Sequence, residues 1–275
     1  MECLINDLPV YFEEYGAGKP ILCLHGYSLD IRSTMGCFEP FFQNKQGYRR
    51  IYLDMPGKGK TPARDWVKNA DIMLDILKQF AHKVIGNEGF LLTGHSYGGY
   101  MALGMAQDTN LTIDGIFLLC PVVITDFKER NLPKATKVIE EKGLRDIICS
   151  DDLKDFEDFL NGTTLANKET WHRYKNEILS GLKVADKNFT AEYRKNGYGF
   201  SFETELNKLQ YANPITVLTG RQDGVTGYED PWNTLKYLPR LTFAALDGAG
   251  HMPQIEKTEA FNFYLKNWLE ACTHA

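Results

Sequence analysis

A serine flanked by glycines is the chain's best candidate for a nucleophile. Ser96 lies in a G-x-S-x-G motif, Gly-His-Ser-Tyr-Gly at residues 94–98, between a strand-like apolar run (90–93) and a helix-compatible stretch of small residues (101–106). In that context the motif predicts a turn so sharp that the serine hydroxyl stands clear of the sheet. Glycine is expected at both outer positions because a Cβ there would collide with the neighbouring strand or helix.

A serine hydroxyl needs a base, and in this class of motif the acid and then the histidine follow the serine along the chain. Three of the six histidines do so: His172, His251 and His274. His251 follows a strand-like run and a glycine-containing turn, so it lies on a loop that a rigid scaffold can hold. His172 lies in a charged stretch typical of a surface helix, and His274 is next to last, where chains usually fray. We predict His251 as the base.

The predicted orienting acid is Asp223, which follows a strand-like run rich in β-branched residues. In a parallel sheet the loops of Ser96, Asp223 and His251 emerge at the same carboxyl edge, where such sheets bind ligands. Asp223 also fits a simple turn before glycine. Asp126 is an open alternative because it follows another strand-like run, whereas Asp247 lies too close to His251 and is better interpreted as a turn residue.

Acyl transfer also needs two backbone N–H donors for the oxyanion. One is expected at Tyr97, the residue after the nucleophile, and the other in the loop after an earlier strand, where we predict Tyr27. His25 lies in the same loop but precedes Ser96, and we expect it to tie the loop by hydrogen bonds. No cluster with metal-ligand spacing stands out, so the prediction includes no metal and no cofactor.

Strand-like and helix-like segments alternate through most of the chain. Apolar runs begin at Leu8, Ile21, Ile51, Phe90, Ile116, Ile215 and Leu241, and helical stretches such as 71–80 separate several of them. This alternation predicts an α/β fold with a mostly parallel, twisted sheet covered by helices on both faces. The segment from Leu8 to Tyr15 is expected to be an edge strand.

Residues 123–210 break this alternation and predict an inserted helical lid, with 1–122 and 211–275 as the core domain. Most of the apolar residues in the insertion are expected to pack on one another, while Trp171 or Phe127 is a candidate for the lining of the site. A lid of this size predicts an enclosed, largely apolar site for a small substrate. The apolar residues recur at helical spacing in three patches: Val138, Ile139, Ile147 and Ile148; Leu153, Phe156, Phe159 and Leu160; Trp171, Tyr174, Ile178 and Leu182.

These motifs resemble the α/β-hydrolase superfamily, and within it the lid-bearing, esterase-like serine hydrolases. The resemblance rests on His25-Gly26 and on residues 54–61, 94–99, 220–223 and 248–251, and the motifs span about two-thirds of the chain. It implies that the turn at 54–61 is structural and lies outside the active site. Relatives that are dehalogenases or epoxide hydrolases carry aspartate at the elbow, so a serine there argues against both activities.

Composition is consistent with this interpretation. The chain has 275 residues, enough for one α/β domain with an insertion, and 43% of them are hydrophobic. A net charge of −5 without long charged runs gives no reason to expect nucleic acid or an anionic membrane as partner. Six scattered cysteines are expected to be reduced thiols, and no signal peptide or membrane span is evident, so the expected location is cytoplasmic. A homodimer is left open.

The sequence therefore predicts a serine hydrolase that cleaves a small, largely apolar acyl substrate, in the first place a carboxylic ester, through an acyl-enzyme. The same triad supports carbon–carbon bond hydrolysis, amide hydrolysis and peracid formation, because the site and not the fold sets the function. From another class, a ligand-binding or signalling protein on a hydrolase scaffold stays an alternative. A lipase acting on aggregated lipid is disfavoured, since no secretion signal or long apolar segment is evident.

Overall fold

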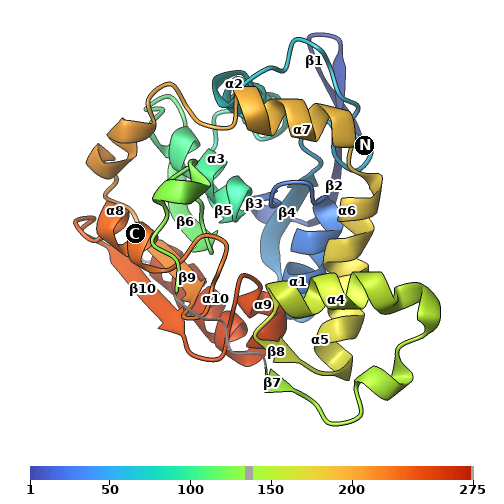
Figure 1. The fold of residues 1–275 in the computed structure, drawn as a ribbon. Coiled ribbons are helices and arrows are strands. Elements are labelled where there is room, and N and C mark those ends of the chain that lie inside the picture. Colours follow the sequence, from blue (N-terminus) through green and yellow to red (C-terminus); the bar gives the residue numbers. More distant parts are fainter. Residues whose placement is uncertain (134–138, 274–275) are drawn as a thin grey trace.

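The computed structural model describes residues 1–133 and 139–273, and its centre is an eight-stranded sheet (Figure 1). The strand order is β1-β2-β4-β3-β5-β6-β9-β10, and every pair from β4 to β10 is parallel, whereas β2 pairs antiparallel with both β1 and β4. The predicted α/β fold is confirmed. The strands are β1 (Glu2–Ile5), β2 (Leu8–Gly16), β3 (Gly18–Leu24), β4 (Gly47–Leu53), β5 (Phe90–His95), β6 (Ile113–Leu119), β9 (Ile215–Gly220) and β10 (Leu241–Leu246).

Each face of the sheet carries its own apolar core. In β3, Leu22 and Leu24 belong to one core and Ile21 and Cys23 to the other, because successive side chains of a strand point to opposite faces. Helices α2 and α3 cover the first core, and α1 and α10 cover the second. These helices are α1 (Ile31–Phe42), α2 (Ala70–Val84), α3 (Tyr97–Ala106) and α10 (Thr258–Thr273).

The prediction of an edge strand at Leu8–Tyr15 is wrong. This segment forms most of β2, and the edge is β1, which pairs with it antiparallel from Ile5 opposite Leu8 outward. Only Cys3 and Ile5 of β1 are buried, and four residues give too short an alternation to stand out in the sequence.

Residues 123–210 form mostly short helices, together with a parallel pair of two-residue strands. Of these segments, η4 and α6 pack against α1, and α6 is the yellow helix beside α1 in Figure 1. The division of the chain into a core and a lid stays a prediction. The elements are η1 (Phe127–Glu129), β7 (Ile139–Glu140), η2 (Arg145–Ile147), η3 (Ser150–Asp152), α4 (Leu153–Gly162), β8 (Leu165–Ala166), α5 (Lys168–Arg173), the π-helix η4 (Tyr174–Leu179), α6 (Ser180–Val184), α7 (Lys187–Asn196) and η5 (Glu203–Lys208).

The first predicted helical patch of this insertion is wrong. Ile139 lies in strand β7 and Ile147 in the 3-10 helix η2, and both side chains are about half exposed. Val138 lies outside the described residues. The spacing matched a helix although Ile139 and Ile147 are exposed and lie in different elements.

The other two patches, apart from the exposed Leu153 and Leu182, belong to a small apolar core that joins the insertion to the loops of the sheet. Phe156, Trp171 and Ile178 pack in one cluster with Leu29, which follows β3, and Met252, which follows His251. The insertion is therefore fixed directly over two of the predicted active-site loops. Helices α8 (Glu229–Leu235) and α9 (Pro253–Glu256) complete the fold. None of the helices described is long and apolar enough to cross a membrane.

Candidate active site

Ser96 lies in the sharp turn between β5 and α3. Its φ of 53° and ψ of −114° are a backbone conformation that residues with a side chain rarely adopt. A Cβ on Gly94 would lie 2.3 Å from the Gly98 carbonyl oxygen, and a Cβ on Gly98 would lie 2.3 Å from the Leu24 carbonyl oxygen. Both positions thus require glycine, for the steric reason predicted from the motif.

The structure brings Ser96, His251 and Asp223 together, although they follow three different strands. Nε2 of His251 lies 3.0 Å from the Ser96 hydroxyl oxygen, and its Nδ1 lies 2.9 Å from Oδ2 of Asp223. Asp223 is fully buried, and its carboxylate also accepts hydrogen bonds from the Thr226 hydroxyl (2.6 Å) and the Val225 amide (2.8 Å). The imidazole is therefore held where it can take the proton of the serine hydroxyl.

The surroundings keep Asp223 ionised. Burial raises the pKa of its carboxyl group, but the His251 charge and the hydrogen bonds from His251, Thr226 and the Val225 amide lower it more, so the pKa falls to about 2. An ionised Asp223 keeps the proton of neutral His251 on Nδ1. The Nε2 atom is then free to accept a proton from Ser96.

The rival residues lie elsewhere. Asp126 is exposed and caps η1, and Asp247 is exposed and accepts a hydrogen bond from the side-chain amide of Gln222 (2.8 Å). Among the described residues, neither carboxylate bonds to a histidine. His172 is exposed on α5, and His274 lies outside the described residues.

His25 and Asp54 have the structural roles predicted for them. Nδ1 of His25 lies 2.8 Å from the carbonyl oxygen of the next residue, and its Nε2 accepts a hydrogen bond from the Met55 amide (2.9 Å). Burial lowers the pKa of His25 to about 4, so the ring is neutral and ties two loops together. Asp54 is also buried and accepts hydrogen bonds from the backbone amides of Ile31 and Lys60.

Two backbone amides beside Ser96 are free to bind an oxyanion. Within the described ranges, the amides of Tyr27 and Tyr97 donate to no protein acceptor. Tyr97 is the first residue of α3, where amides lack helical partners and the helix dipole favours negative charge. Tyr27 lies in the loop after β3 and lines a cavity together with Ser96. The two rings pack edge to face with centres 5.4 Å apart, which fixes the two loops against each other.

The cavity above Ser96 has a volume of about 280 Å³. Its lining is mostly apolar, as predicted, and includes Ile178 and Leu182 of the third patch. Trp171 and Phe127 do not line it: Trp171 is buried in the cluster of the insertion, and Phe127 is half exposed elsewhere.

Two arginines in the lining, Arg130 and Arg194, were missed by sequence analysis. Arg130 directly follows the short helix η1 and Arg194 lies in α7, both in charged stretches where no spacing distinguishes a residue of the site from one on the surface.

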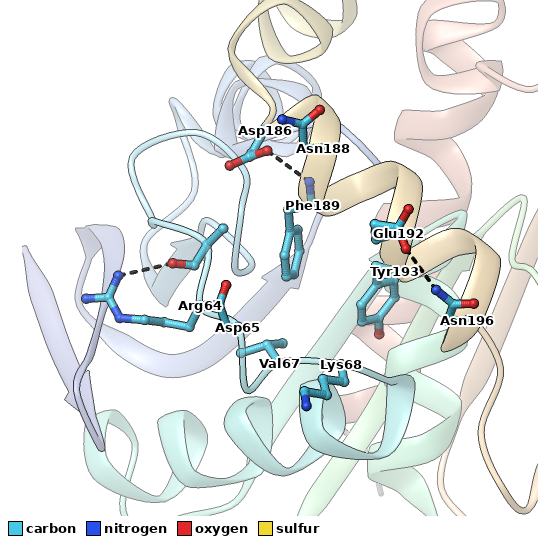
Figure 2. Close-up of a pocket in the computed structure, with 11 residues that line it drawn as sticks. Arg64, Asp65, Val67, Lys68, Asp186, Asn188, Phe189, Glu192, Tyr193 and Asn196 are labelled. Carbon is cyan, nitrogen blue, oxygen red and sulfur yellow. Dashed lines mark hydrogen bonds between the residues drawn. The ribbon is translucent and has the colours of Figure 1, made fainter.

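A larger cavity of about 490 Å³ lies between the loop 63–68 and α7 (Figure 2). The Phe189 ring points from α7 toward this loop. Asp186 accepts a hydrogen bond from the Phe189 amide (2.9 Å), and Glu192 accepts one from the Asn196 side chain (3.0 Å). Both carboxylates therefore form hydrogen bonds within α7 and its N-terminal cap. None of the predicted catalytic residues lines this cavity, whereas Ser96 and His251 line the smaller one.

One set of groups at the site has the composition of a metal centre. Cys120, Asp223 and His251 place ligand atoms within 4.8 Å of one another. A metal requires the thiolate form of cysteine, and burial raises the pKa of the Cys120 thiol well above its usual value. Asp223 and His251 are, moreover, hydrogen-bonded directly to each other. The donor set therefore fits a proton relay better than a metal ion.

Comparison with known proteins agrees with this geometry. A model of the alpha/beta hydrolase family matches residues 21–262. The chain belongs to this family. A solved structure with the same fold, an alpha/beta superfamily hydrolase from Oenococcus oeni PSU-1, has a TM-score of 0.89 and 34% sequence identity, with 96% of each chain covered.

More distant members of the α/β-hydrolase family differ in activity. The chain is 23% identical over 260 residues to a pimeloyl-[acyl-carrier protein] methyl ester esterase from Legionella pneumophila (strain Corby), covering 92% of this chain and 95% of the esterase. It is 26% identical over 289 residues to a proline iminopeptidase from Xylella fastidiosa (strain 9a5c), covering 90% of this chain and 89% of the peptidase. Similarity at this level identifies a hydrolase family with esterase members and leaves the substrate open.

Proposed function

We propose that this α/β-hydrolase cleaves a carboxylic ester of a small molecule through Ser96, His251 and Asp223. The observation that carries the proposal is the continuous hydrogen-bonded chain from the Ser96 hydroxyl through His251 to buried Asp223. A serine held in a strained turn, with a base and an orienting acid in line, is the arrangement that activates a hydroxyl for attack on an acyl carbonyl.

In the proposed mechanism Ser96 attacks the ester carbonyl while Nε2 of His251 takes its proton. The amides of Tyr27 and Tyr97 stabilise the tetrahedral oxyanion, and each donor contributes on the order of 3 kcal/mol to the transition state. His251 then protonates the leaving alcohol, and an acyl-enzyme on Ser96 remains. Water, activated by the same histidine, hydrolyses the acyl-enzyme and restores the serine hydroxyl.

The insertion 123–210 is proposed to act as the lid of this site. It contributes Ile178 and Leu182 to the cavity, and its apolar cluster rests on Leu29 and Met252. A cavity of about 280 Å³ under such a cover suits a small molecule rather than a polymer.

Amide hydrolysis and carbon–carbon bond hydrolysis remain alternatives on the same triad. The proline iminopeptidase among the relatives represents the first class, and the methyl ester esterase supports the ester proposal. Rates on a matched ester, anilide and dienoic diketone separate the three classes, because they share the nucleophile and differ in the leaving group.

Hydrolysis of p-nitrophenyl butyrate tests the proposed function. The wild-type protein should hydrolyse the ester with a burst of p-nitrophenol, and Ser96→Ala should lose up to roughly a million-fold in kcat. Ser201→Ala, which removes an exposed serine, is the matched control and should retain the wild-type rate. An unchanged rate in Ser96→Ala would refute the proposal.

A further inference from the structure

We propose that the substrate carries a negatively charged group, a carboxylate in the simplest case, remote from the scissile carbonyl, and that Arg194 and Arg130 bind it. This inference rests on the proposed function, since it concerns the same cavity. It names the substrate class that the family and the triad leave open.

The charges that line the cavity have one sign. Arg130 and Arg194 lie in its wall, and the lining contains no aspartate or glutamate. The nearest acidic group of the relay, Asp223, is fully buried behind His251, to which it is hydrogen-bonded. A small cavity with two guanidinium groups and no acidic lining favours an anionic ligand, because positive charge raises the local concentration of anions.

Arg194 contacts two aromatic rings, and its guanidinium group is not engaged by a hydrogen bond or an ion pair among the described residues. Its guanidinium carbon lies 5.7 Å from the centre of the Tyr27 ring and 5.4 Å from that of Tyr198. Within residues 1–133 and 139–273, the guanidinium group has no ion-pair or hydrogen-bond partner. Packing on the rings orders the side chain, while its N–H donors remain free for a planar oxyanion such as a carboxylate.

Arg130 is fixed by the backbone instead. Its Nε donates to the Ile124 carbonyl oxygen (2.8 Å) and its Nη1 to that of Val225 (2.8 Å). Its Nη2 also lies 3.5 Å from the Thr125 carbonyl oxygen, so these bonds occupy three of the five N–H donors of the guanidinium group. No carboxylate in the described part of the chain pairs with this half-buried charge. Holding a half-buried cation without a counter-ion costs stability, and an anionic substrate would supply the missing partner.

The two cations share the cavity wall with Tyr198, and Arg194 lies 5.4 Å from the centre of its ring. Burial raises the pKa of the Tyr198 hydroxyl, and the charges of both Arg130 and Arg194 lower it, so both lie within electrostatic reach of this group. The rest of the lining includes apolar side chains such as Ile178 and Leu182. The cavity thus fits a molecule with an apolar part and one charged end.

The test compares esters that differ in one charge. Monomethyl adipate and methyl hexanoate share a six-carbon acyl chain, and acetoxyacetate and propyl acetate place the charge or its neutral match on the alcohol side. We expect a higher kcat/KM for the anion in at least one pair. Arg194→Gln should lower that anion-to-neutral ratio about tenfold, as expected for the loss of one charge-assisted hydrogen bond. Added salt should lower the wild-type ratio as well.

Lys195→Gln is the matched control, since it removes an exposed charge one residue away on α7 that does not line this cavity. It should leave the ratio within twofold of the wild-type value. The inference is overturned if Arg194→Gln leaves the ratios of both pairs unchanged, or if Lys195→Gln lowers them equally.

Binding to an inactive protein separates this inference from the proposed function. In the Ser96→Ala background, calorimetric titration with both charged esters should show binding of at least one that weakens about tenfold when Arg194→Gln is added. If the wild-type protein hydrolyses no ester but this binding depends on Arg194, the proposed function fails and the anion site stands. If it hydrolyses neutral esters while Arg194→Gln affects neither binding nor the ratios, the anion site fails and the proposed function stands.

Discussion

The His95 ring lies against the His251 ring, with centres 5.1 Å apart, and its Nε2 lies 3.2 Å from the His251 carbonyl oxygen. Burial, followed by the His251 charge, lowers the pKa of His95 to about 3, so the ring is neutral at physiological pH. A neutral ring can bond to a carbonyl only as a donor, so the proton of His95 is on Nε2. His95 thereby fixes the backbone of His251.

Replacing His95 tests this positioning role. His95→Leu removes the donor while keeping similar bulk, and we expect kcat to fall about tenfold because the His251 loop loses one hydrogen bond. His95→Gln places an amide N–H near the position of Nε2 and should recover most of the loss. The measurement is kcat on p-nitrophenyl butyrate for both variants. Equal rates in the two variants would contradict the role of the hydrogen bond.

The depressed pKa of Asp223 predicts a specific dependence of stability on pH. A carboxyl group with a folded-state pKa of about 2 stabilises the fold above its unfolded value near 4, and this contribution is lost as the pH falls toward 2. The difference in unfolding free energy between wild type and Asp223→Asn should therefore shrink by roughly 1 kcal/mol between pH 5 and pH 3. Urea titrations of both proteins measure it, and a difference that stays constant over this range would contradict the assignment.

Asp223→Asn should also slow turnover. The amide cannot hold His251 in the tautomer that accepts the serine proton, and the loss expected in kcat is on the order of 10⁴-fold. Asp126→Asn, at the rival carboxylate on η1, should keep the wild-type kcat. If Asp126→Asn lowered kcat more than Asp223→Asn did, the orienting acid would be Asp126 and not Asp223.

Glu256 connects the insertion to the loop that carries His251. Its buried carboxylate accepts hydrogen bonds from the Gly250 amide (2.7 Å) and the Leu165 amide (3.0 Å). In Glu256→Gln the side-chain NH₂ group would face one of these backbone N–H groups, and two donors cannot bond to each other. We therefore expect the free energy of unfolding to fall by about 2 kcal/mol and kcat to be lower. Glu259→Gln, at an exposed position of α10, is the control. Equal melting temperatures for the two variants would show that the hydrogen bonds of Glu256 do not contribute to stability.

Lys58 predicts a second rise of stability with pH, in this case at the alkaline end. Its ammonium group is buried about 5 Å from the centres of the Tyr27, Phe189 and Tyr193 rings, and burial lowers its pKa to about 7. Since the unfolded chain binds this proton up to pH 10.5, stability should rise by about 2 kcal/mol between pH 7 and pH 9. Lys58→Met should remove this rise in urea titrations. A rise that persists in the variant would exclude Lys58 as its source.

The proximity of Ser96, His251 and Asp223 could be predicted because the placement of these residues follows from local rules. The elbow at Ser96 depends on glycines whose absent Cβ atoms make room for neighbouring carbonyls, and such glycines are visible in the sequence. Asp223 and His251 follow strands β9 and β10, and parallel strands bring their carboxyl ends to one edge. No long-range packing has to be known to expect these three residues together.

The lining of the cavity could not be predicted in this way. Whether Arg194 or Phe127 faces Ser96 depends on how the insertion packs, and this is set by tertiary contacts such as that between Phe156 and Trp171 (ring centres 5.2 Å apart). Helical spacing indicates that the Trp171 side chain is buried, but it does not indicate which residues the side chain packs against. The same limit explains Ile139, whose apolar character matched a helix although it forms part of a two-residue strand.

Labelling with a fluorophosphonate probe tests most directly the central claim that Ser96 is an activated nucleophile. The probe reacts only with a serine whose hydroxyl is activated by the surrounding residues. The folded protein should form one covalent adduct, which peptide mass spectrometry should map to Ser96, and His251→Ala or prior unfolding in guanidinium should abolish it. A folded wild-type protein that remains unlabelled, or that carries the adduct on another residue, would contradict the account.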